Sequence, residues 1–324
     1  MGKRKVKWGI LGPGNIANQF VNDFQYVTNG EVISVASSSL ARAGKFANKF
    51  GIENFYGSYE ELYNDENVEA IYIATPHNFH FEQSKAALLA GKAVLSEKPI
   101  TISRNQAEEL FQVAKECDQL IMEGMWTYFL PAILKAKSWV EEGKIGKVLH
   151  IKSDFGHLMD KDPKNRLYNP DLAGGSIHDL GIYNIAMSAL FTLEDIRSLE
   201  ATAQFADTGV ETNVYGILRY GEVGCHFHLD FDCMLPNRLA IIGDQGRVEV
   251  DDFWAAKRCR RYELDVLAEE YVDEHPCNGF MHEINAFNEA YLAGDRQVGN
   301  VPHAASLHFQ EVMDTLFRAI RHKR

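Results

Sequence analysis

The chain has 324 residues, of which 46% are hydrophobic and 24% are charged, and its formal net charge is −12. This composition is typical of a folded globular protein, and the length favours two domains that share a cleft. The acidic balance argues against nucleic acid as a main partner, because phosphate binding favours a basic surface. The apolar runs are short and broken by charged residues, so the sequence predicts no membrane-spanning helix.

The basic start of the chain, at residues 1–5, leads directly into a strand pattern and lacks the apolar core of a secretory signal. The chain has five cysteines, an odd number, and none of them forms a CxxC pair. Unpaired thiols favour a reducing compartment, so we expect a cytoplasmic protein without a disulfide framework or a structural zinc.

The first third of the chain alternates β-branched runs with helical patterns. Two capping pairs, Ser58 with Glu61 and Ser103 with Gln106, mark helix starts. Such alternation indicates βαβ units, so we expect an α/β domain with a doubly wound parallel sheet over residues 1–123. Its strands are predicted at residues 6–11, 32–36, 70–74, 93–96 and 120–123, and its further helices at residues 16–27, 40–50 and 81–89.

After Gly124 the pattern changes to one helix, at residues 130–142, followed by a series of strands. Two amphipathic helices near residues 280–291 and 309–320 close the chain. The sequence therefore predicts an α+β domain over residues 124–324 with a large, mostly antiparallel open sheet, whose last helix can pack back on the first domain. The strands are predicted at residues 148–155, 199–205, 212–220, 224–231, 239–243 and 247–251.

A glycine-rich turn lies where the first predicted strand ends and the first helix begins. Gly12 allows the tight turn, Gly14 lets a pyrophosphate approach the backbone, and Ala17 is small enough for the helix to pack on the sheet. The helix N-terminus offers N–H groups to the phosphates. The motif is weak by itself, but in this position it predicts a Rossmann dinucleotide site. The full turn reads Gly12-Pro13-Gly14-Asn15-Ile16-Ala17.

The end of the second predicted strand indicates which dinucleotide this site binds. An NAD enzyme usually has Asp or Glu there, to bind the ribose 2′-hydroxyl. This chain has Ser37, Ser38 and Ser39, with Arg42 shortly after them. Hydroxyls and a cation suit a 2′-phosphate, so the sequence favours NADP(H) over NAD(H). The alternative interpretation is that Arg42 is a solvated helix residue.

Further motifs follow the glycine turn in a fixed order. They are TPHNFH at residues 75–80, EKP at residues 97–99, MEGMW at residues 122–126 and GGSIHDLGIY at residues 174–183. In this order they resemble the glucose–fructose oxidoreductase / inositol dehydrogenase / MocA family. The MEGMW segment and Tyr183 are most similar to its dimeric dihydrodiol dehydrogenase and D-xylose dehydrogenase branch.

The resemblance implies an oxidoreductase that moves a hydride between nicotinamide and a carbinol carbon. It implies that Lys98 lies near the nicotinamide and that Tyr183 is the acid/base, with Asp179 on the same helix face orienting the substrate. A lysine cation and an oxidised nicotinamide would both favour the tyrosinate that such a base requires. Further cofactor contacts are expected at Thr75, Pro76, His77, His80 and Glu97.

Several residues near these motifs have two interpretations each. Trp126, Trp254 and Arg166 are candidate substrate contacts, or they brace the core and a loop. His80 is a cofactor contact or a helix cap. His178 adjoins Asp179 in sequence, but adjacent helical residues do not share a face, so we interpret His178 as structural.

Two histidine-containing segments resemble metal sites. In residues 225–233 (CHFHLDFDC), alternation puts both histidines and both aspartates on one strand face, which is also how a half-buried strand looks. His282 and Glu283 lack the second histidine of an HExxH zinc motif. We therefore expect no metal. We interpret the polar stripe as surface or as part of the homodimer interface that the resemblance implies.

Three other functions compete with this interpretation. A cofactor-binding sensor would not need Lys98, Asp179 and Tyr183 together. A Rossmann methyltransferase would not explain the EKP motif. An NAD-dependent cyclitol or sugar dehydrogenase would carry histidine in place of Tyr183 and an acidic residue after the second strand. We therefore expect an NADP(H)-dependent oxidoreductase whose substrate is a sugar, a trans-dihydrodiol or a small dicarbonyl.

Overall fold

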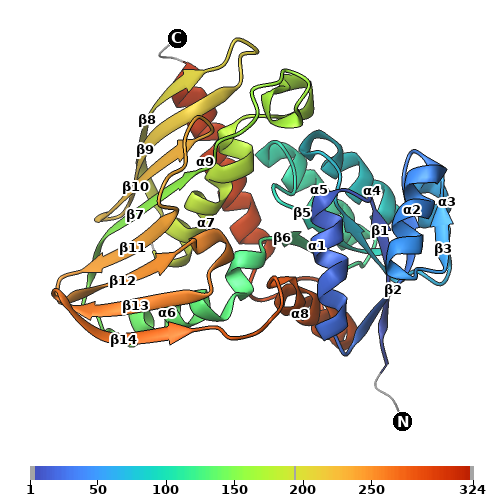
Figure 1. Ribbon diagram of the computed structural model, residues 1–324, viewed down its shortest axis with the longest axis horizontal. Helices are drawn as coiled ribbons and strands as arrows, with labels where there is room; N and C mark the ends of the chain where they lie inside the picture. Colours follow the sequence, from blue (N-terminus) through green and yellow to red (C-terminus); the bar gives the residue numbers. More distant parts are fainter. Residues whose placement is uncertain (1–3, 193–194, 322–324) are drawn as a thin grey trace. The chain divides into compact units, whose positions relative to one another are not determined.

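The computed structural model describes residues 4–192 and 195–321. The chain folds into two compact units (Figure 1). The first consists of residues 1–126 and 276–307, and the second of residues 127–275 and 308–324. Among the described residues, no helix combines the length and the apolar character that a bilayer span requires.

The first unit is built on a six-stranded parallel sheet in the order β3-β2-β1-β4-β5-β6. The strand order reverses between β1 and β4, and sheets of this type bind ligands at the carboxyl ends of the strands at such a point. The strands are β1 (Val6–Leu11), β2 (Gly30–Ala36), β3 (Asn54–Tyr56), β4 (Ala70–Ile73), β5 (Ala93–Glu97) and β6 (Ile121–Gly124). The helices between them are α1 (Asn15–Asp23), α2 (Leu40–Phe50), α3 (Tyr59–Tyr63), α4 (His80–Leu89) and α5 (Arg104–Glu116).

Both faces of this sheet are covered, which explains why every residue of β4 and β5 is buried. On one face, Ile71, Ile73 and Val94 pack in a core with apolar residues of α4 and α5. On the other face, Trp8 and Tyr72 pack with aromatic rings, and Tyr72 stacks on Phe20 of α1 at 3.6 Å between ring centroids. The continuous apolar character of the strands, visible in the sequence, follows from this double burial.

The helix α8 (Phe280–Ala293) belongs to the first unit although it lies far along the chain. The Asp23 carboxylate, at the end of α1, accepts hydrogen bonds from the backbone N–H groups of Asn278 (3.0 Å) and Gly279 (2.9 Å) just before α8 begins. Trp8 Nε1 of β1 donates to Asn288 Oδ1 of α8 at 2.9 Å. These buried bonds attach α8 to the Rossmann sheet.

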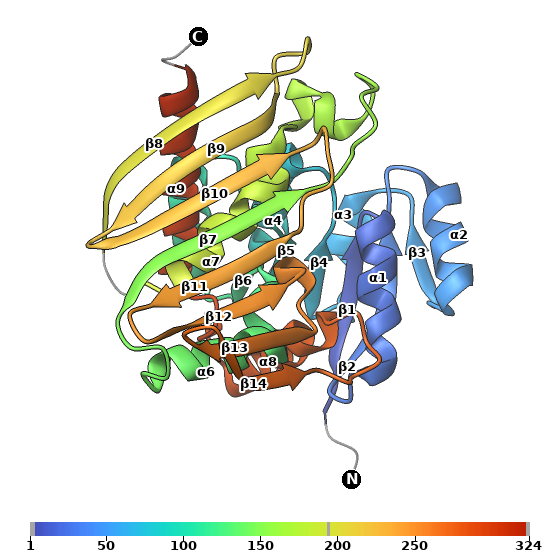
Figure 2. The ribbon, with the colours of Figure 1, turned by 60° about the vertical axis from the view of Figure 1, so that its left-hand side comes forward.

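The second unit is built on an eight-stranded sheet in the order β14-β13-β12-β11-β7-β10-β9-β8, seen in Figure 2. Strands β7 and β10 pair in parallel, and the other neighbours are antiparallel. The strands are β7 (Val148–Gly156), β8 (Ile196–Phe205), β9 (Glu211–Tyr220), β10 (Val223–Asp230), β11 (Arg238–Gly243), β12 (Gly246–Asp251), β13 (Arg258–Glu263) and β14 (Val266–Val272). The helices are α6 (Pro131–Glu141), α7 (Ile182–Leu190) and α9 (His303–Arg321). The first residues of α9, before His308, belong to the first unit.

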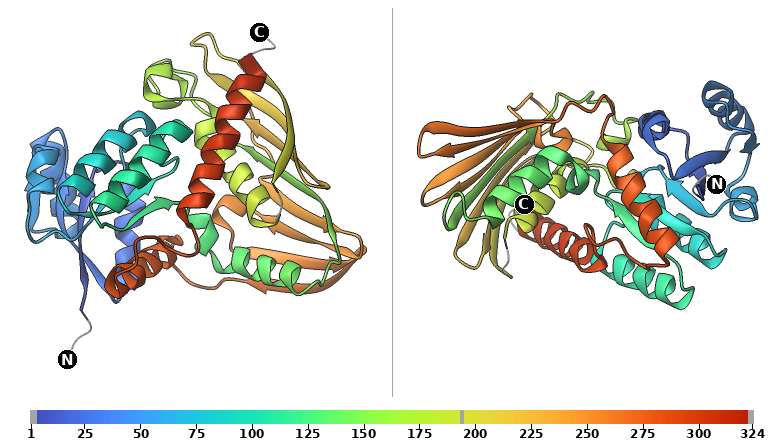
Figure 3. Two further views of the ribbon diagram at one scale, coloured as in Figure 1. Left: turned by 180° about the vertical axis from the view of Figure 1, so that it is seen from behind. Right: turned by 90° about the horizontal axis from the view of Figure 1, so that it is seen from below.

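These helices lie on one face of the second sheet, as the left view of Figure 3 shows. Strand β9 illustrates the difference between the two faces. Val214 and Leu218 are buried, whereas the alternate residues Tyr215, Ile217 and Arg219 are exposed. The alternation expected of an antiparallel sheet with one open face is therefore present.

The predicted fold class is confirmed, with differences in individual elements. Neither β3 nor the hairpin of β13 and β14 was predicted from the sequence. The first helix was predicted to extend through Val27, but a 3₁₀ turn (Phe24–Tyr26) replaces the α-helix there. Strands β13 and β14 carry many charged residues that pair across the hairpin, such as Arg261 with Glu269 at 2.9 Å. Charged residues in this density hide the apolar alternation by which strands are recognised.

Candidate active site

The glycine-rich turn forms at the end of β1, as the sequence predicts. Gly12 has a φ of +91°, which side-chain-bearing residues rarely adopt, and a Cβ there would lie 2.9 Å from Thr75 Cγ2 and 3.1 Å from the Ala74 carbonyl oxygen. Gly14 is the N-cap residue of α1, and no side chain caps this helix. The N–H groups of the first turn are therefore suited to bind an anion.

A cavity of about 490 Å³ lies beside this turn, wholly within the first unit. This volume is within the ~300–1,000 Å³ typical of small-molecule sites. Its lining includes residues that the sequence analysis singled out for the cofactor: Gly12, Gly14, Ser37, Ser38, Arg42, Thr75 and Pro76. Pro13, Tyr59, Ala74, Phe79 and Gln83 line it as well.

The three remaining residues of the glycine motif lie in α1. Asn15 and Ile16 are its first two residues, directly after the Gly14 cap. Ala17 is fully buried, which agrees with the role of a small residue where the helix meets the sheet.

Arg42 and Ser38 form a polar corner of the cavity after β2. The Arg42 guanidinium donates to Ser38 Oγ at 2.8 Å, and Ser39 caps α2 by accepting from the Arg42 backbone N–H. The described lining of the cavity contains no carboxylate. The corner therefore offers a cation and hydroxyl groups where NAD-specific sites have an acidic side chain.

Two lining residues, Tyr59 and Gln83, were not predicted as cofactor contacts from the sequence. Tyr59 is the first residue of α3, and Ser58 caps that helix in a capping box with Glu61. Gln83 of α4 accepts a hydrogen bond from Thr75 Oγ1 at 2.5 Å. The capping box was visible in the sequence, but nothing in it showed that the helix starts at a cavity.

His80 is fully buried at the start of α4. Its Nδ1 lies 2.8 Å from the Pro99 carbonyl oxygen, and its Nε2 lies 2.8 Å from the Thr75 carbonyl oxygen. The ring therefore links the turn after β4 to the loop after β5, and both nitrogens contact backbone within the chain. This geometry favours a bracing role for His80. His77 is also buried and is not among the residues that line the cavity.

The EKP motif lies at the carboxyl end of β5. The Glu97 carboxylate is buried and accepts hydrogen bonds from the Tyr72 hydroxyl and, at 3.2 Å, from the Lys98 backbone N–H. The Lys98–Pro99 peptide bond is cis, and the Lys98 side chain is half-buried. Lys98 thus follows a buried strand at the sheet edge where ligands bind in parallel sheets.

Glu123 of β6 is a second buried carboxyl group near this motif. It accepts a hydrogen bond from the Ile100 backbone N–H at 2.9 Å. Burial raises the pKa of Glu123 to about 7, with a further increase from the Glu97 charge, although the bonds from Ser306 and Ile100 and the Lys98 ammonium oppose the shift. The group therefore titrates near neutral pH.

Glu283 of α8 is a third buried carboxyl group in the first unit, and it is fully enclosed. Neither of its carboxyl oxygens has a hydrogen-bond partner among the described residues. Burial, and then the charges of Glu97 and Asp23, raise the pKa of Glu283 well above its usual value. Both effects favour the neutral, protonated form of Glu283 over its carboxylate.

In the second unit, the motif that ends in Tyr183 forms a widened helical turn. Ile177–Gly181 is a π-helix that continues directly into α7. Asp179 lies in the π turn and Tyr183 in the first turn of α7, and both side chains are buried. The helix was predicted, but its π turn was not, and such turns are rare and frequent at functional sites. The four-residue rule of the α-helix therefore does not by itself align these two side chains.

Arg166 and Trp254 lie with these residues in the second unit. An Arg166 guanidinium nitrogen lies 3.1 Å from Asp179 Oδ1. The Tyr183 ring packs edge-on against Phe155 at 5.6 Å between centroids, and Trp254 stacks on Phe155 at 5.7 Å. Phe155 of β7 was not predicted as a site residue, because strand alternation marks it only as part of the core.

His178 and Trp126 occupy packed positions. His178 is buried beside Phe317 of α9, at 4.8 Å between ring centroids. Burial lowers the pKa of His178 to about 4, so its imidazole is neutral at neutral pH, in agreement with a structural role. Trp126 belongs to the first unit and stacks on Phe280 at 4.5 Å.

The polar stripe of β10 does not form a group with metal-ligand spacing among the described residues. His226 is exposed on the open face of the sheet, and His228 stacks on the Tyr215 ring at 3.9 Å. Asp230, by contrast, is buried and accepts a hydrogen bond from Asn213 Nδ2 at 2.6 Å. The stripe is therefore part surface and part internal hydrogen bonding.

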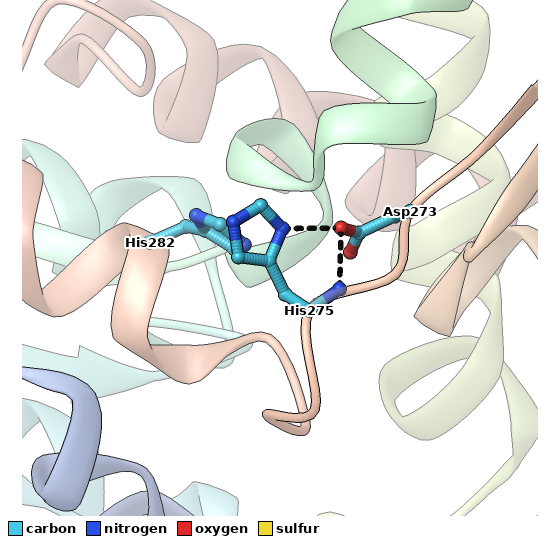
Figure 4. Close-up of side chains that lie close together, drawn as sticks. All are labelled: Asp273, His275 and His282. Atoms are coloured by element: carbon cyan, nitrogen blue, oxygen red, sulfur yellow. Dashed lines mark hydrogen bonds and ion pairs between the residues drawn. The ribbon is translucent and has the colours of Figure 1, made fainter.

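Figure 4 shows the described group whose ligand atoms do have metal-like spacing, namely Asp273, His275 and His282. Within the second unit, the Asp273 carboxylate accepts from the His275 backbone N–H at 3.1 Å and contacts its Nδ1 at 2.5 Å. His282 belongs to the first unit. The group is therefore divided between the units and defines no metal site within either one.

The sequence matches known families over both units. Residues 6–125 match the family described as "Oxidoreductase family, NAD-binding Rossmann fold", and residues 133–249 match the "GFO/IDH/MocA C-terminal domain". The protein therefore belongs to the glucose–fructose oxidoreductase / inositol dehydrogenase / MocA family, as the motifs predict. It is an NAD(P)-dependent oxidoreductase that acts on CH–OH groups.

Two dehydrogenases are similar to this chain in sequence. The trans-1,2-dihydrobenzene-1,2-diol dehydrogenase of Mus musculus is 32% identical to this chain and covers 97% of both sequences. The Homo sapiens protein of the same name is 33% identical over 76% of this chain and 74% of its own.

Solved structures are similar over the whole chain. The 3-ketoreductase KijD10 from Actinomadura kijaniata, in complex with NADP and TDP-benzene, has a TM-score of 0.89 and 26% identity and covers 98% of both chains. The aldose-aldose oxidoreductase from Caulobacter crescentus has a TM-score of 0.91 over 99% of both chains. At 24% identity, this second likeness concerns the fold.

Proposed function

We propose that this protein is an NADP(H)-dependent dehydrogenase in which Tyr183 exchanges the proton of the reacting hydroxyl. The observation that carries the choice of cofactor is the polar corner of the cavity, where Arg42 and Ser38 meet and the described lining has no carboxylate. Arginine forms strong, charge-assisted hydrogen bonds with phosphate groups. Bound there, NADP(H) supplies the hydride chemistry, and the protein supplies binding, orientation and charge.

The residues of the first unit fit this cofactor. The N–H groups at the start of α1 would bind the pyrophosphate, since Gly12 and Gly14 place no side chain of their own in its way. Ser37, Ser38 and Arg42 would bind the 2′-phosphate. The relative KijD10 was solved with NADP, which agrees with this choice.

In the proposed mechanism, Tyr183 is the acid/base. A free tyrosine has a pKa of about 10, so it needs a neighbouring positive charge to act as a base at neutral pH. We assign this charge to the Lys98 ammonium. During oxidation, Tyr183 takes the proton of the substrate hydroxyl, and during reduction the phenol returns it. Asp179, which is paired with Arg166, accepts a hydrogen bond from the substrate and orients it.

The surroundings of Tyr183 favour a substrate with an apolar ring and neighbouring hydroxyl groups. The half-buried Trp254, which stacks on the buried Phe155 beside Tyr183, provides aromatic surface, and the Arg166–Asp179 pair provides polar contacts. A trans-dihydrodiol has both features, and it is the substrate class named for the curated relatives. Sugars and small dicarbonyls are the other candidate classes.

We further propose a cytoplasmic homodimer that forms through the open face of the second sheet. Tyr215 and Ile217 are 53% and 43% exposed on this face, and the core of a homodimer interface is typically rich in apolar and aromatic residues. The odd number of cysteines and the lack of a CxxC pair suit a reducing compartment. Light scattering should give twice the chain mass for the wild type and the monomer mass for Ile217→Asp. A monomeric wild type would contradict the proposal.

The decisive experiment for the reaction is a substrate panel followed by the absorbance of NADPH. Purified protein is mixed with NADP⁺ and either trans-1,2-dihydrobenzene-1,2-diol or D-xylose, and with NADPH and a small dicarbonyl. We expect turnover of at least one class, fastest with the dihydrodiol. Tyr183→Phe should lower it about 10²- to 10⁴-fold, whereas Tyr215→Phe should not. Equal turnover by Tyr183→Phe would refute the assigned acid/base.

A further inference from the structure

We propose that Glu211 is a positioning residue of the active site, whose buried carboxyl group holds the π turn that carries Asp179 and leads into Tyr183. Glu211 is the first residue of β9, far along the chain from the turn. The inference rests on the proposed function for the roles of Asp179 and Tyr183, but the contact between Glu211 and the turn is independent of those roles.

The first support is the hydrogen bond at the start of the turn. Glu211 Oε1 accepts from the backbone N–H of Ile177, the first residue of the π-helix, at 2.9 Å. The N-cap residue Ser176 makes no side-chain cap bond. The first N–H groups of a helix have no acceptor within the helix, and Glu211 of strand β9 provides one for the Ile177 N–H. A negative charge is also favourable at this end of a helix.

The second support is the complementary shape of Gly175. Its φ is +110°, and a Cβ there would lie 2.3 Å from Glu211 Oε1 and 2.7 Å from Glu211 Cδ. The second glycine of the motif thus leaves the space that the Glu211 carboxyl group occupies. This explains why the motif needs glycine at this point, which the sequence alone did not show.

The third support is that the start of the turn is bound on its other side to the loop of Arg166. The Gly175 N–H donates to the Leu167 carbonyl oxygen at 2.8 Å. A Cβ on Gly174 would lie 2.6 Å from that same oxygen and 2.7 Å from the Arg166 carbonyl oxygen. Gly174 and Gly175 are therefore packed between Glu211 and the loop of Arg166. Because these glycines lead into the turn that carries Asp179, their position affects the ion pair between Asp179 and Arg166.

The surroundings of Glu211 are poor in charge. Its side chain is buried, and burial raises its pKa to about 7, although the Ile177 bond and the more distant Arg321 of α9 oppose the shift. A buried polar group is costly unless it is hydrogen-bonded, so the bond from Ile177, together with one from the backbone N–H of Glu211 itself, stabilises the carboxyl group in this position. Either protonation state keeps an oxygen that can accept this bond.

The consequence for the site follows from helix geometry. A π turn contains one residue more than an α turn and is the less common conformation. If the Ile177 N–H loses its acceptor, the turn can rewind to α-helix, and one residue corresponds to a rotation of about 100°. Asp179 would then point in another direction relative to Tyr183. Glu211 therefore affects the mutual orientation of the two residues without contacting the substrate.

The test compares Glu211→Ala, which removes the acceptor, with Glu211→Gln, which keeps an acceptor oxygen. Glu200→Ala, an exposed position on the neighbouring strand β8, is the matched control. Hydrogen exchange is followed by mass spectrometry in peptides that cover residues 176–184. We expect about tenfold faster exchange in Glu211→Ala, because a buried hydrogen bond is lost, and near wild-type exchange in Glu211→Gln. Unchanged exchange in Glu211→Ala would overturn the proposal.

Steady-state kinetics show whether Glu211 positions the catalytic residues or only stabilises the turn. With trans-1,2-dihydrobenzene-1,2-diol, we expect kcat of Glu211→Ala to fall about 10- to 100-fold, because small displacements of catalytic groups reduce the rate by that factor. We expect Glu211→Gln to have nearly the wild-type kcat. The Kd for NADPH should stay constant in both variants. Faster exchange with an unchanged kcat would contradict a positioning role. If the wild type turns over no substrate, the proposed function fails, whereas the exchange experiment still decides whether Glu211 holds the turn.

A second variant keeps the test decisive if Glu211→Ala does not fold. Gly175→Ala places a methyl group where the Glu211 carboxyl group lies. We expect it to increase exchange in residues 176–184 as Glu211→Ala does, with no change in the peptides of the Rossmann sheet. Wild-type exchange in Gly175→Ala would refute the close fit on which the inference depends.

Discussion

The cofactor site and the π turn differ in how the chain builds them. The glycine turn of the cofactor site uses consecutive residues, because Gly12, Gly14 and the start of α1 follow one another directly. The π turn depends on a partner 34 residues further along the chain, Glu211. A site made of local backbone geometry can be recognised in a sequence, whereas a turn stabilised by a distant side chain cannot. Substitutions in each of the two sites should therefore have separable effects.

The largest effect is expected for Tyr183→Phe, which removes the hydroxyl of the residue after the π turn. General acid–base groups contribute about 10²- to 10⁴-fold, so kcat should fall by that factor. The Kd for NADPH should not change, because the cofactor cavity lies in the first unit. Steady-state kinetics and fluorescence titration measure the two quantities. A parallel loss of cofactor affinity would show that the two sites are not separable in this way.

Arg42→Ala tests the cofactor site. Hydrogen bonds to charged groups contribute about 1.5–3 kcal/mol, so the Kd for NADPH should rise about 10- to 100-fold. The Kd for NADH should stay nearly constant, because NADH has no 2′-phosphate. Arg104→Ala, which removes an exposed arginine paired with Glu108 on α5, is the control. Equal losses for both nucleotides in Arg42→Ala would mean that Arg42 stabilises the fold of the cavity only.

Glu123→Gln tests the buried carboxyl groups near the EKP motif. The folded-state pKa of Glu123 is raised to about 7, so its contribution to stability is fully present below the unfolded pKa of 4.5 and is lost as the pH rises through 7. Thermal unfolding at pH 5.5 and pH 8.5 should therefore show a larger loss of stability for the wild type than for Glu123→Gln. The expected difference is on the order of 2 kcal/mol. Identical pH dependence would contradict the raised pKa.

The smallest effect is expected for Arg166→Ala. Its partner Asp179 is buried, but the Arg166 side chain is 46% exposed, and exposed ion pairs contribute about 0–1 kcal/mol. We expect KM to rise about two- to fivefold with kcat nearly constant, because substrate orientation rather than proton transfer is affected. A large loss of kcat would instead give Arg166 a direct part in the chemistry.

The parts of the site that were predicted from the sequence are those formed by residues close together in the chain. The glycine turn, the serine and arginine residues after β2 and the position of Lys98 at a strand end all depend on neighbouring residues, and the structure has them in one unit. Tyr59 and Gln83 were missed because a helix start does not reveal which cavity it faces. Phe155 and Glu211 were missed because their partners lie on other elements.

Two larger features also depend on long-range contacts. Nothing in residues 174–183 distinguishes a π turn from an α-helix, since the bond that caps it comes from β9. Likewise, the sequence of α8 shows an amphipathic helix but not its attachment to the Rossmann sheet, which depends on Asp23 and Trp8.

Binding of NADPH and NADH to the purified wild-type protein, by fluorescence titration and by thermal shift, tests the choice of cofactor. We expect tight binding of NADPH and at least about tenfold weaker binding of NADH, the difference that a charged hydrogen bond to a phosphate provides. Equal affinity or a preference for NADH would contradict the assigned role of Arg42 and Ser38.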